Sequence, residues 1–295
     1  MSIGVDFRLR GVPVALRPHR VGLDPTTSLT DGEFWRATLT PEGPGTLHLR
    51  WRTGELEVAA YGAGRAWLLD RAGDYAGLSD PGHQFGPTAH PVVLEAQRVV
   101  DLRLSNGHCL YHTLLPTVLG QRVTAEEAHR SWRRLCLRYG KPAPGPAPLV
   151  LPPEPSVLAS EPYWRFHPLG VDRHRAEALR TVARVADRLF ALDDASPEPA
   201  RSFLSRLPGI GQWTIGAALG HALGDADAVA VGDFHLKNTV AWALADEPRA
   251  SDERMLELLE PYAGQRARVV ALISMTVGHA PRFGPRQRIL PMERW

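Results

Sequence analysis

The chain has 295 residues, a length that suits about two domains. Apolar residues make up 44% of it and charged residues 22%, the balance of an ordinary globular protein, which excludes collagen, a coiled coil and wholesale disorder. The formal net charge of +2 neither requires nor excludes a polyanionic partner, because the local arrangement of charges decides binding.

The cysteine count and the N-terminus bear on cofactors and location. Two cysteines, Cys109 and Cys136, are too few for a disulfide framework or a four-thiolate iron–sulfur cluster. The first residues, MSIGVDFRLR, contain no apolar stretch of the kind that secretion signals carry, and no apolar run approaches the length of a membrane span. We therefore expect a cytoplasmic protein without membrane contact.

The first 85 or so residues are predicted to form short strands. Apolar and polar residues alternate over residues 46–52 and 55–61, and residues 34–39 read as a further strand. This alternation is typical of an antiparallel sheet with one face toward water.

After residue 90 the apolar periodicity becomes helical. Thr124 and Glu127 form a capping-box start for a helix that ends at Gly140. Residues 141–155 contain seven prolines and form either a domain linker or a loop over the surface. A helix follows Asp172, and Ser196 with Pro197 begins another. Further helices are predicted over residues 212–223, 234–245, 252–260 and 265–278. The prediction is an α+β protein with an antiparallel β-rich domain over 1–88 and an all-helical domain over 89–295.

The segment LSRLPGIGQWT, residues 204–214, predicts a helix, a tight hairpin and a second helix at about 198–223. The hairpin glycines permit positive φ or close backbone approach. The free amides at the start of the second helix form an anion site that reads a phosphate without reading sequence. The simpler alternative is a hairpin that only joins two core helices. The residues predicted to bind phosphate here are Leu207, Gly209, Gly211, Gln212 and Thr214.

The string LPGIGQWT resembles the helix-hairpin-helix DNA glycosylase superfamily, and more closely its alkylbase (3-methyladenine DNA glycosylase II) branch. Three other segments resemble the family in the same order along the chain: VLGQRVT at 118–124, the LG…HRAEAL stretch at 169–179, and VAVGDFHL at 229–236. The resemblance implies a small antiparallel β domain ahead of an all-helical glycosylase domain. It also implies base excision repair of flipped, damaged bases in double-stranded DNA.

Asp233 matches the position of the family's catalytic aspartate, 20 residues after Trp213. A carboxylate beside C1′ stabilises the oxocarbenium character of the sugar and can orient a water molecule. Asp233 also has the sequence context of a helix N-cap, and the two roles are compatible.

Trp213 stands where bifunctional relatives carry a nucleophilic lysine. The only lysines are Lys141 and Lys237, and neither lies in the hairpin, so we expect a monofunctional enzyme without lyase activity. The resemblance implies that Trp213 lines the base pocket, where its π face suits a cationic alkylated purine. The alternative is a core tryptophan.

The rest of the aromatic pocket is incomplete in the sequence. Ala217 stands where the family type can place another aromatic residue, and residues 266–273 contain none. We expect that Phe34, Trp35 or Tyr262 could compensate.

Further site residues follow from the resemblance. Arg122, with Gln121 as a second candidate, is expected to fill the gap left by a flipped base. His235 is expected to contact a phosphate. A structural Na⁺ or K⁺ is implied at the backbone carbonyls of Ser205, Leu207 and Ile210. No other cofactor is expected.

The predicted function is a monofunctional DNA glycosylase, monomeric and nucleoid-associated, acting on 3-methyladenine and 7-methylguanine type lesions. Cationic purines are favoured because they need the least help as leaving groups. One alternative is a glycosylase for hypoxanthine, 8-oxoguanine or uracil. Another is a non-catalytic DNA-binding protein, which would have no need of Asp233.

Overall fold

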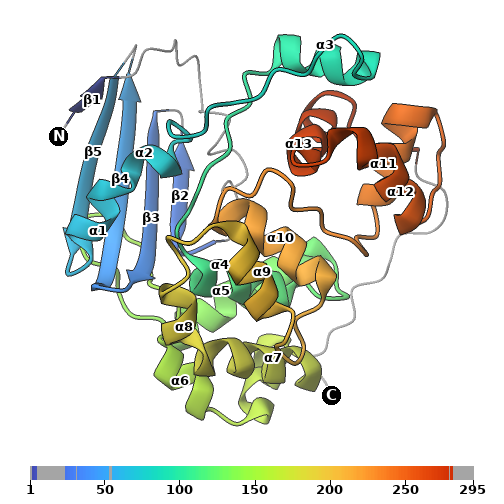
Figure 1. Cartoon of the computed structure of the whole chain (residues 1–295). Coiled ribbons are helices and arrows are strands. Elements are labelled where there is room, and N and C mark those ends of the chain that lie inside the picture. The colour runs from blue at the N-terminus through green and yellow to red at the C-terminus, as the bar shows by residue number, and fades with distance from the viewer. Residues whose placement is uncertain (1, 5–23, 31, 53–54, 279, 282–295) are drawn as a thin grey trace.

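An antiparallel sheet forms the N-terminal part of the molecule (Figure 1). The structure is a computed structural model that describes residues 2–4, 24–30, 32–52, 55–278 and 280–281. The five strands lie in the order β1-β5-β4-β3-β2. Their bounds are β1 Ser2–Gly4, β2 Thr27–Thr30, β3 Glu33–Thr40, β4 Gly43–Arg52 and β5 Glu55–Gly62. The three strands predicted from the sequence are therefore present.

Two short helices, α1 (Arg65–Asp70) and α2 (Ala72–Tyr75), lie across one face of the sheet (Figure 1). Apolar residues of β3, β4 and β5 pack there against Trp67, Leu68 and Tyr75. The sequence prediction of strands alone in this region is wrong, because the segment after Gly64 is too short and irregular in pattern to show a helical period.

The opposite face of the sheet is not fully open to water. Ala37 and Leu39 of β3 are buried in the main helical core, and Thr46 of β4, opposite Ala37, is buried too. Farther along this face, His48 and Arg50 of β4 are half-buried. The expectation of one wet face is therefore wrong for β3. Alternation within a strand cannot show that a second layer packs over only part of the sheet.

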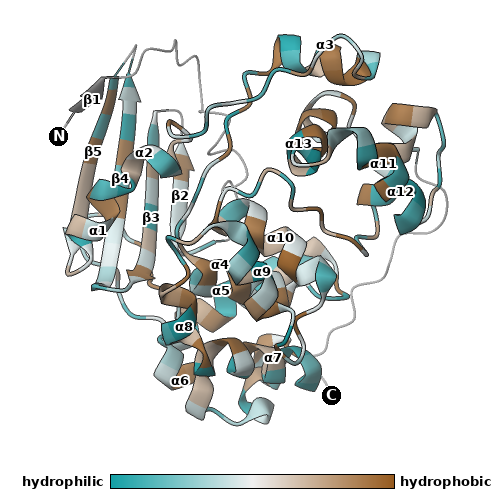
Figure 2. Ribbon diagram, in the orientation of Figure 1, coloured by the Kyte–Doolittle hydropathy of each residue, from teal (hydrophilic) through white to brown (hydrophobic). Residues whose placement is uncertain are grey.

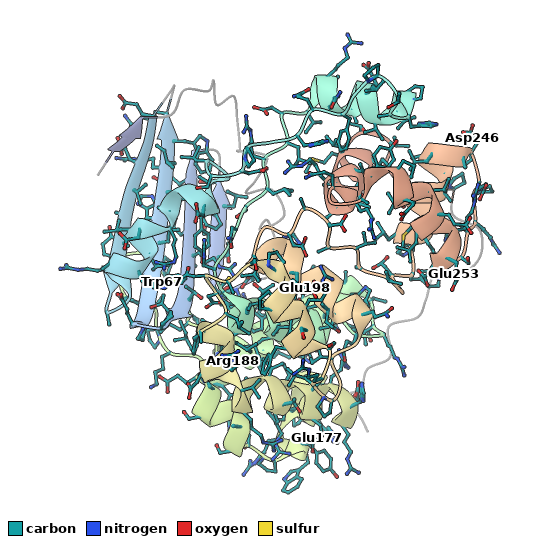
Figure 3. The ribbon with its side chains drawn as sticks, viewed as in Figure 1. Trp67, Glu177, Arg188, Glu198, Asp246 and Glu253 are labelled. Carbon is teal, nitrogen blue, oxygen red and sulfur yellow. The ribbon has the colours of Figure 1, made fainter. Side chains whose placement is uncertain are left out.

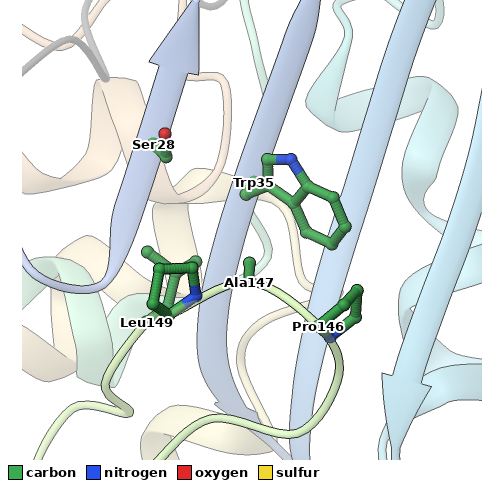
Figure 4. A pocket seen from close by; sticks show the side chains of 6 residues that line it. Ser28, Trp35, Pro146, Ala147 and Leu149 are labelled. Atoms are coloured by element: carbon green, nitrogen blue, oxygen red, sulfur yellow. The ribbon is translucent and has the colours of Figure 1, made fainter.

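The proline-rich segment 141–155 lies over the sheet and is not a free linker. Val150 donates its backbone N–H to Pro25 O at 2.9 Å, and Pro142 forms an isolated antiparallel bridge with Val150. A cavity of about 310 Å³ lies between this segment and Trp35, lined also by Ser28 and residues 146–149 (Figure 4). The segment thus acts as a surface loop.

The main helical core is built around α4, whose residues are almost all buried. Thr124 accepts from the Glu127 backbone N–H and Glu127 Oε2 accepts from the Thr124 backbone N–H, which confirms the predicted capping box. Asp172 caps the following long helix by accepting from the Arg175 backbone N–H. The elements are α4 Leu110–Leu119, α5 Ala125–Tyr139, α6 Pro155–Ser160, the 3₁₀ helix η2 Tyr163–Leu169, α7 Arg173–Arg184, α8 Ala186–Phe190, α9 Pro197–Leu204 and α10 Gln212–Ala222.

A second cluster of helices has its own apolar core on the far side of α10 from the sheet (Figure 1). In Figure 2 the outward part of α12 is hydrophilic, as expected for a helix that covers this core. Arg268 of α13 forms a buried ion pair with Asp80 at 2.8 Å. The elements are α3 Pro91–Val99, α11 Leu236–Ala245, α12 Asp252–Leu259, the 3₁₀ helix η3 Glu260–Tyr262 and α13 Arg266–Thr276.

The architecture confirms the predicted α+β class, with the sheet first and the helices after it. The domain boundary at residue 88 stays a prediction. Among the residues described, none of the helices has the length and apolar character needed to span a membrane.

Candidate functional site

The predicted hairpin is present at residues 205–211, between α9 and α10. Gly209 has φ +81, and a Cβ added there would lie 2.9 Å from the Cβ of Ala178 on α7. Ile210 is buried in the main core, and its N–H donates to Leu207 O at 3.1 Å. Glycine is thus required at 209 both by backbone conformation and by the closeness of α7.

The start of α10 presents backbone amides beside the hairpin. Gly211 is the N-cap and contributes no side-chain bond, and both Gly211 and Gln212 are exposed. The first amides of any helix have no intrahelical partner, and they lie at the positive end of the helix dipole. The start of α10 therefore leaves backbone donors at Gln212 and Thr214 beside exposed Gly211, although the side chain of Thr214 is buried. The Leu207 N–H instead donates to Leu204 O at 3.0 Å, and the phosphate site stays a prediction.

The loop after α4 packs against this hairpin. The side-chain amide of Gln121 donates to Gly209 O and to Thr214 Oγ1, each at 2.9 Å. Arg122 is exposed and has φ +58, which is uncommon for a residue other than glycine. The structure thus brings Gln121 onto the hairpin and leaves Arg122 facing outward.

Arg175 fixes the same loop from behind. The residue is 1% exposed, and its guanidinium donates to Leu119 O at 2.9 Å and to Gly170 O at 3.1 Å. Its charge is paired with Asp172 at 2.6 Å. The arginine of the HRAEAL stretch therefore ties the end of α4 to the start of α7.

Asp233 lies at the start of α11 and its carboxylate is held by three donors. Oδ1 accepts from the backbone N–H groups of His235 at 2.8 Å and Leu236 at 2.9 Å. Oδ2 accepts from the Trp213 indole N–H at 3.1 Å. Asp233 therefore accepts from the two amides at the start of α11, whose N-cap residue is His235, while its second oxygen is directed toward the helix that follows the hairpin.

Trp213 joins the two halves of the site. Its ring is half-buried, and a Cβ added at Gly120 would lie 3.2 Å from the ring atom Cη2. One edge of the indole therefore packs on the loop after α4 while its N–H reaches Asp233. This position accounts for the glycine at 120, and it differs from that of a fully buried core tryptophan.

The compensating aromatic residues proposed from the sequence lie elsewhere. Phe34 is fully buried in the sheet core, and Tyr262 is buried in the second helical core with its hydroxyl accepting from the His90 N–H. Trp35 stacks on His48 at 3.6 Å, beneath the proline-rich segment. The expectation that Phe34 or Tyr262 could complete an aromatic pocket is therefore wrong, because each is held in a different core.

Phe234 is an aromatic residue that the sequence reasoning missed. It follows Asp233 directly, is 78% exposed, and its ring packs edge-on against His235 at 4.9 Å. The signal available in the sequence was its place outside the apolar period of α11, immediately after the aspartate. His235, predicted to contact phosphate, is exposed beside it.

The predicted cation at the hairpin carbonyls finds no support in the geometry. Leu207 O already accepts from the Ile210 N–H. Within the described part of the chain, no cluster of His, Cys, Asp and Glu side chains could hold a metal ion.

Comparison with known proteins tests the fold. No family model matches the chain. The structure is similar to that of a 3-methyladenine DNA glycosylase from Archaeoglobus fulgidus, with a TM-score of 0.75, 17% identity, and 92% of this chain and 96% of that chain covered. It is also similar to MBOgg1 in complex with a low-affinity DNA ligand, with a TM-score of 0.68, 14% identity, and 92% and 93% of the two chains covered. The chain has the helix-hairpin-helix DNA glycosylase fold.

This fold agrees with a match at the level of sequence. Over 122 residues the chain is 32% identical to a probable bifunctional transcriptional activator/DNA repair enzyme AlkA of Mycobacterium tuberculosis. The match covers 41% of this chain and only 24% of that protein's length. The resemblance to the helix-hairpin-helix glycosylases, the alkylbase branch included, is thus confirmed for the fold.

Proposed function

We propose that the chain is a monofunctional DNA glycosylase of base excision repair that hydrolyses the N-glycosidic bond of flipped, alkylated purines. The observation that carries the proposal is the Asp233 carboxylate, fixed by two backbone amides and the Trp213 indole at the helix that follows the hairpin. In a protein that only bound DNA, this carboxylate would hold the start of α11 but would also repel phosphate.

Binding begins with the backbone. The backbone amides at the start of α10 donate hydrogen bonds to a phosphate of the damaged strand, and this contact is independent of base sequence. Arg122 then enters the stack in place of the flipped base, since its planar guanidinium can stack on bases and donate to the orphaned partner. Gln121 supports this step indirectly, because its amide is engaged with the hairpin.

The chemical step falls to Asp233. As the bond between base and sugar lengthens, positive charge develops on the sugar, and a carboxylate beside C1′ stabilises it. The N-glycosidic bond breaks with its electron pair going to the base, water adds to C1′, and the proton that the water loses passes to the Asp233 carboxylate and from there to solvent. A cationic 3- or 7-alkylpurine leaves as a neutral base and needs no protonation. This suits a proposed mechanism in which Asp233 acts as a carboxylate and no second acidic group protonates the base.

Two aromatic faces suit a cationic base. Trp213 packs against Gly120 at the end of α4, and exposed Phe234 follows Asp233 directly. Cation–π attraction to such rings is worth about 0.5–2 kcal/mol, more as the site loses water. Phe234 thus supplies an aromatic ring that the sequence reasoning sought elsewhere.

The lysines support a reaction without a Schiff base. Lys141 pairs with Glu154 at 2.6 Å on the proline-rich segment, and Lys237 lies 3.4 Å from Asp252. The hairpin position that carries a nucleophilic lysine in bifunctional relatives is Trp213. We infer hydrolysis that leaves an intact abasic site.

Base release from methylated duplex DNA tests the proposal. We expect Asp233→Asn to lower the single-turnover rate by about 10²–10³-fold, the cost of removing one charge-stabilising group. Binding to undamaged duplex should change little. Asp187→Asn, which neutralises an exposed carboxylate on α8, is the matched control and should keep the wild-type rate.

Two outcomes would overturn parts of this proposal. Full activity of Asp233→Asn would remove Asp233 from the chemistry. Strand cleavage without hot alkali, or trapping of a covalent complex by borohydride, would show a lyase. Hypoxanthine, 8-oxoguanine and uracil duplexes in the same assay test the other lesions.

A further inference from the structure

Asp252 reaches the backbone of the turn that carries Asp233. It is the first residue of α12, and its Oδ1 accepts from the Gly232 N–H at 3.1 Å. Gly232 immediately precedes Asp233 and has φ +93. A single side chain from a helix that begins 20 residues later thus holds the backbone next to the proposed catalytic carboxylate.

Lys237 of α11 pairs with the carboxylate of Asp252. Its Nζ lies 3.4 Å from Asp252 Oδ2, and it belongs to the first turn of α11. The side chains of Asp252 and Lys237 are 24% and 28% exposed. The pair therefore links the start of α12, the start of α11 and the turn between α10 and α11.

The turn has few other constraints before Asp233. Val231 N–H donates to Val229 O at 2.9 Å, and Asp233 N–H donates to Ala230 O at 3.1 Å. The second of these bonds closes a four-residue turn from Ala230 to Asp233, in which Gly232 holds the positive-φ position that favours glycine. The bond to Asp252 is the contact that fixes the Gly232 amide.

Rotation about Gly232 would move Asp233 relative to C1′ of a bound nucleotide. A displacement of about 1 Å in a reacting geometry can cost about 10²-fold in rate. We propose that Asp252 is a positioning residue for Asp233, and that Lys237 holds the Asp252 carboxylate in place. This inference rests on the proposed function, because it assigns the pair to the same reaction.

The charges are also matched to a DNA-binding surface. An unpaired carboxylate next to Asp233 would add repulsion toward phosphate, and Lys237 offsets it. Asp252 makes its positioning contact through one oxygen while the other is neutralised.

The test compares three variants. Asp252→Ala removes both contacts, and we expect the single-turnover rate of base release to fall about 10–100-fold. Asp252→Asn keeps an oxygen acceptor for the Gly232 N–H and should recover most of the rate. Glu253→Ala removes a charge from the same first turn of α12 without touching Gly232 and should match the wild type (Figure 3 labels Glu253). The Kd for undamaged duplex should change less than about threefold in all three.

A second measurement does not depend on activity. Hydrogen exchange of the Gly232 amide should quicken in Asp252→Ala and stay slow in Asp252→Asn and Glu253→Ala. Wild-type rates in Asp252→Ala, or unchanged Gly232 exchange, would overturn the proposal. If the wild type releases no base from any substrate, the proposed function fails, and the exchange data alone still decide whether Asp252 fixes the turn.

Discussion

The hairpin at 205–211 and the turn at 229–236 meet at the hydrogen bond between Trp213 and Asp233, yet they are held in different ways. The direct contacts of the hairpin are neutral: the Gln121 amide on Gly209 O, the close approach of Ala178, and buried Ile210. The loop that carries Gln121 is in turn anchored by the ion pair of Arg175 with Asp172. The turn is fastened by carboxylates, its own and that of Asp252.

Carboxylates also hold helix α13 in the second helical core. The segment before α3 is joined to α13 by the buried ion pair of Asp80 and Arg268, and the Arg266 N–H donates to Asp227. Contacts that depend on ionised carboxylates weaken in acid, whereas neutral amide contacts do not. The neutral contacts of the hairpin should therefore hold at a pH that weakens the ion pair of Asp80 with Arg268.

The largest effect is expected at Asp80. Burial alone would raise the pKa of its carboxyl, but the hydrogen bonds from Arg268 and from the Leu104 N–H hold that pKa below its ordinary value. Asp80→Asn leaves Arg268 buried without a counter-charge, and we expect the free energy of unfolding to fall by about 3–5 kcal/mol at neutral pH.

The pH dependence of this loss follows from the sign of the shift. A depressed carboxyl pKa contributes stability that is present above the ordinary value of about 3.9 and is lost as the pH falls through the folded value. Urea unfolding at pH 7, 5 and 3 should therefore show the wild type and Asp80→Asn converging in acid. A difference in the free energy of unfolding that stayed constant with pH would show that the contribution of Asp80 does not depend on its ionisation.

A smaller effect is expected at Gly216, where α10 and the turn touch. A Cβ added there would lie closer than 3.0 Å to the Val229 carbonyl oxygen. Gly216→Ala should lower the free energy of unfolding by about 2–3 kcal/mol, because backbone must shift. Gly220→Ala, in the same helix but with its nearest contact at 4.0 Å, is the control and should stabilise by up to about 1 kcal/mol. Equal changes in melting temperature for the two variants would show that α10 is not tightly packed against Val229 at Gly216.

The smallest effect is expected at Gln121. Gln121→Leu keeps the shape but leaves Gly209 O without its donor, which should cost about 1–2 kcal/mol. Because no charge is involved, this loss should be the same at pH 5 and 7 and at low and high salt. Gln212→Leu changes an exposed glutamine of α10 and serves as the control for stability. A loss that varies with salt would show that the hairpin also depends on charges.

Local sequence signals predicted much of the fold. The alternation over 46–52 and the capping box at Thr124 each depend on neighbouring residues, and the structure confirms both. The helices predicted over 212–223 and 252–260 are found within one residue of those bounds. The sequence did not predict the packing between layers, such as the helical core that covers β3. The residues of one strand do not indicate which other elements pack over that strand.

The site divides along the same line. The positions of Asp233 and of the hairpin followed from motif and spacing, although their proposed roles remain to be tested. The contact of Gln121 with Gly209 spans 88 residues, and that of Asp252 with Gly232 spans 20. No local pattern marks either pair. Phe234 was missed for another reason, since exposure of an aromatic side chain is a property of the fold.

The left-handed backbone of Arg122 has a consequence for engineering this chain. A non-glycine residue at φ +58 is strained by about 1–2 kcal/mol, so Arg122→Gly relieves strain and should raise the melting temperature. A selection for heat resistance alone would therefore discard the one side chain proposed to replace the flipped base. Stabilising libraries built on this scaffold should hold position 122 constant, because thermal tolerance and repair would otherwise be selected against each other.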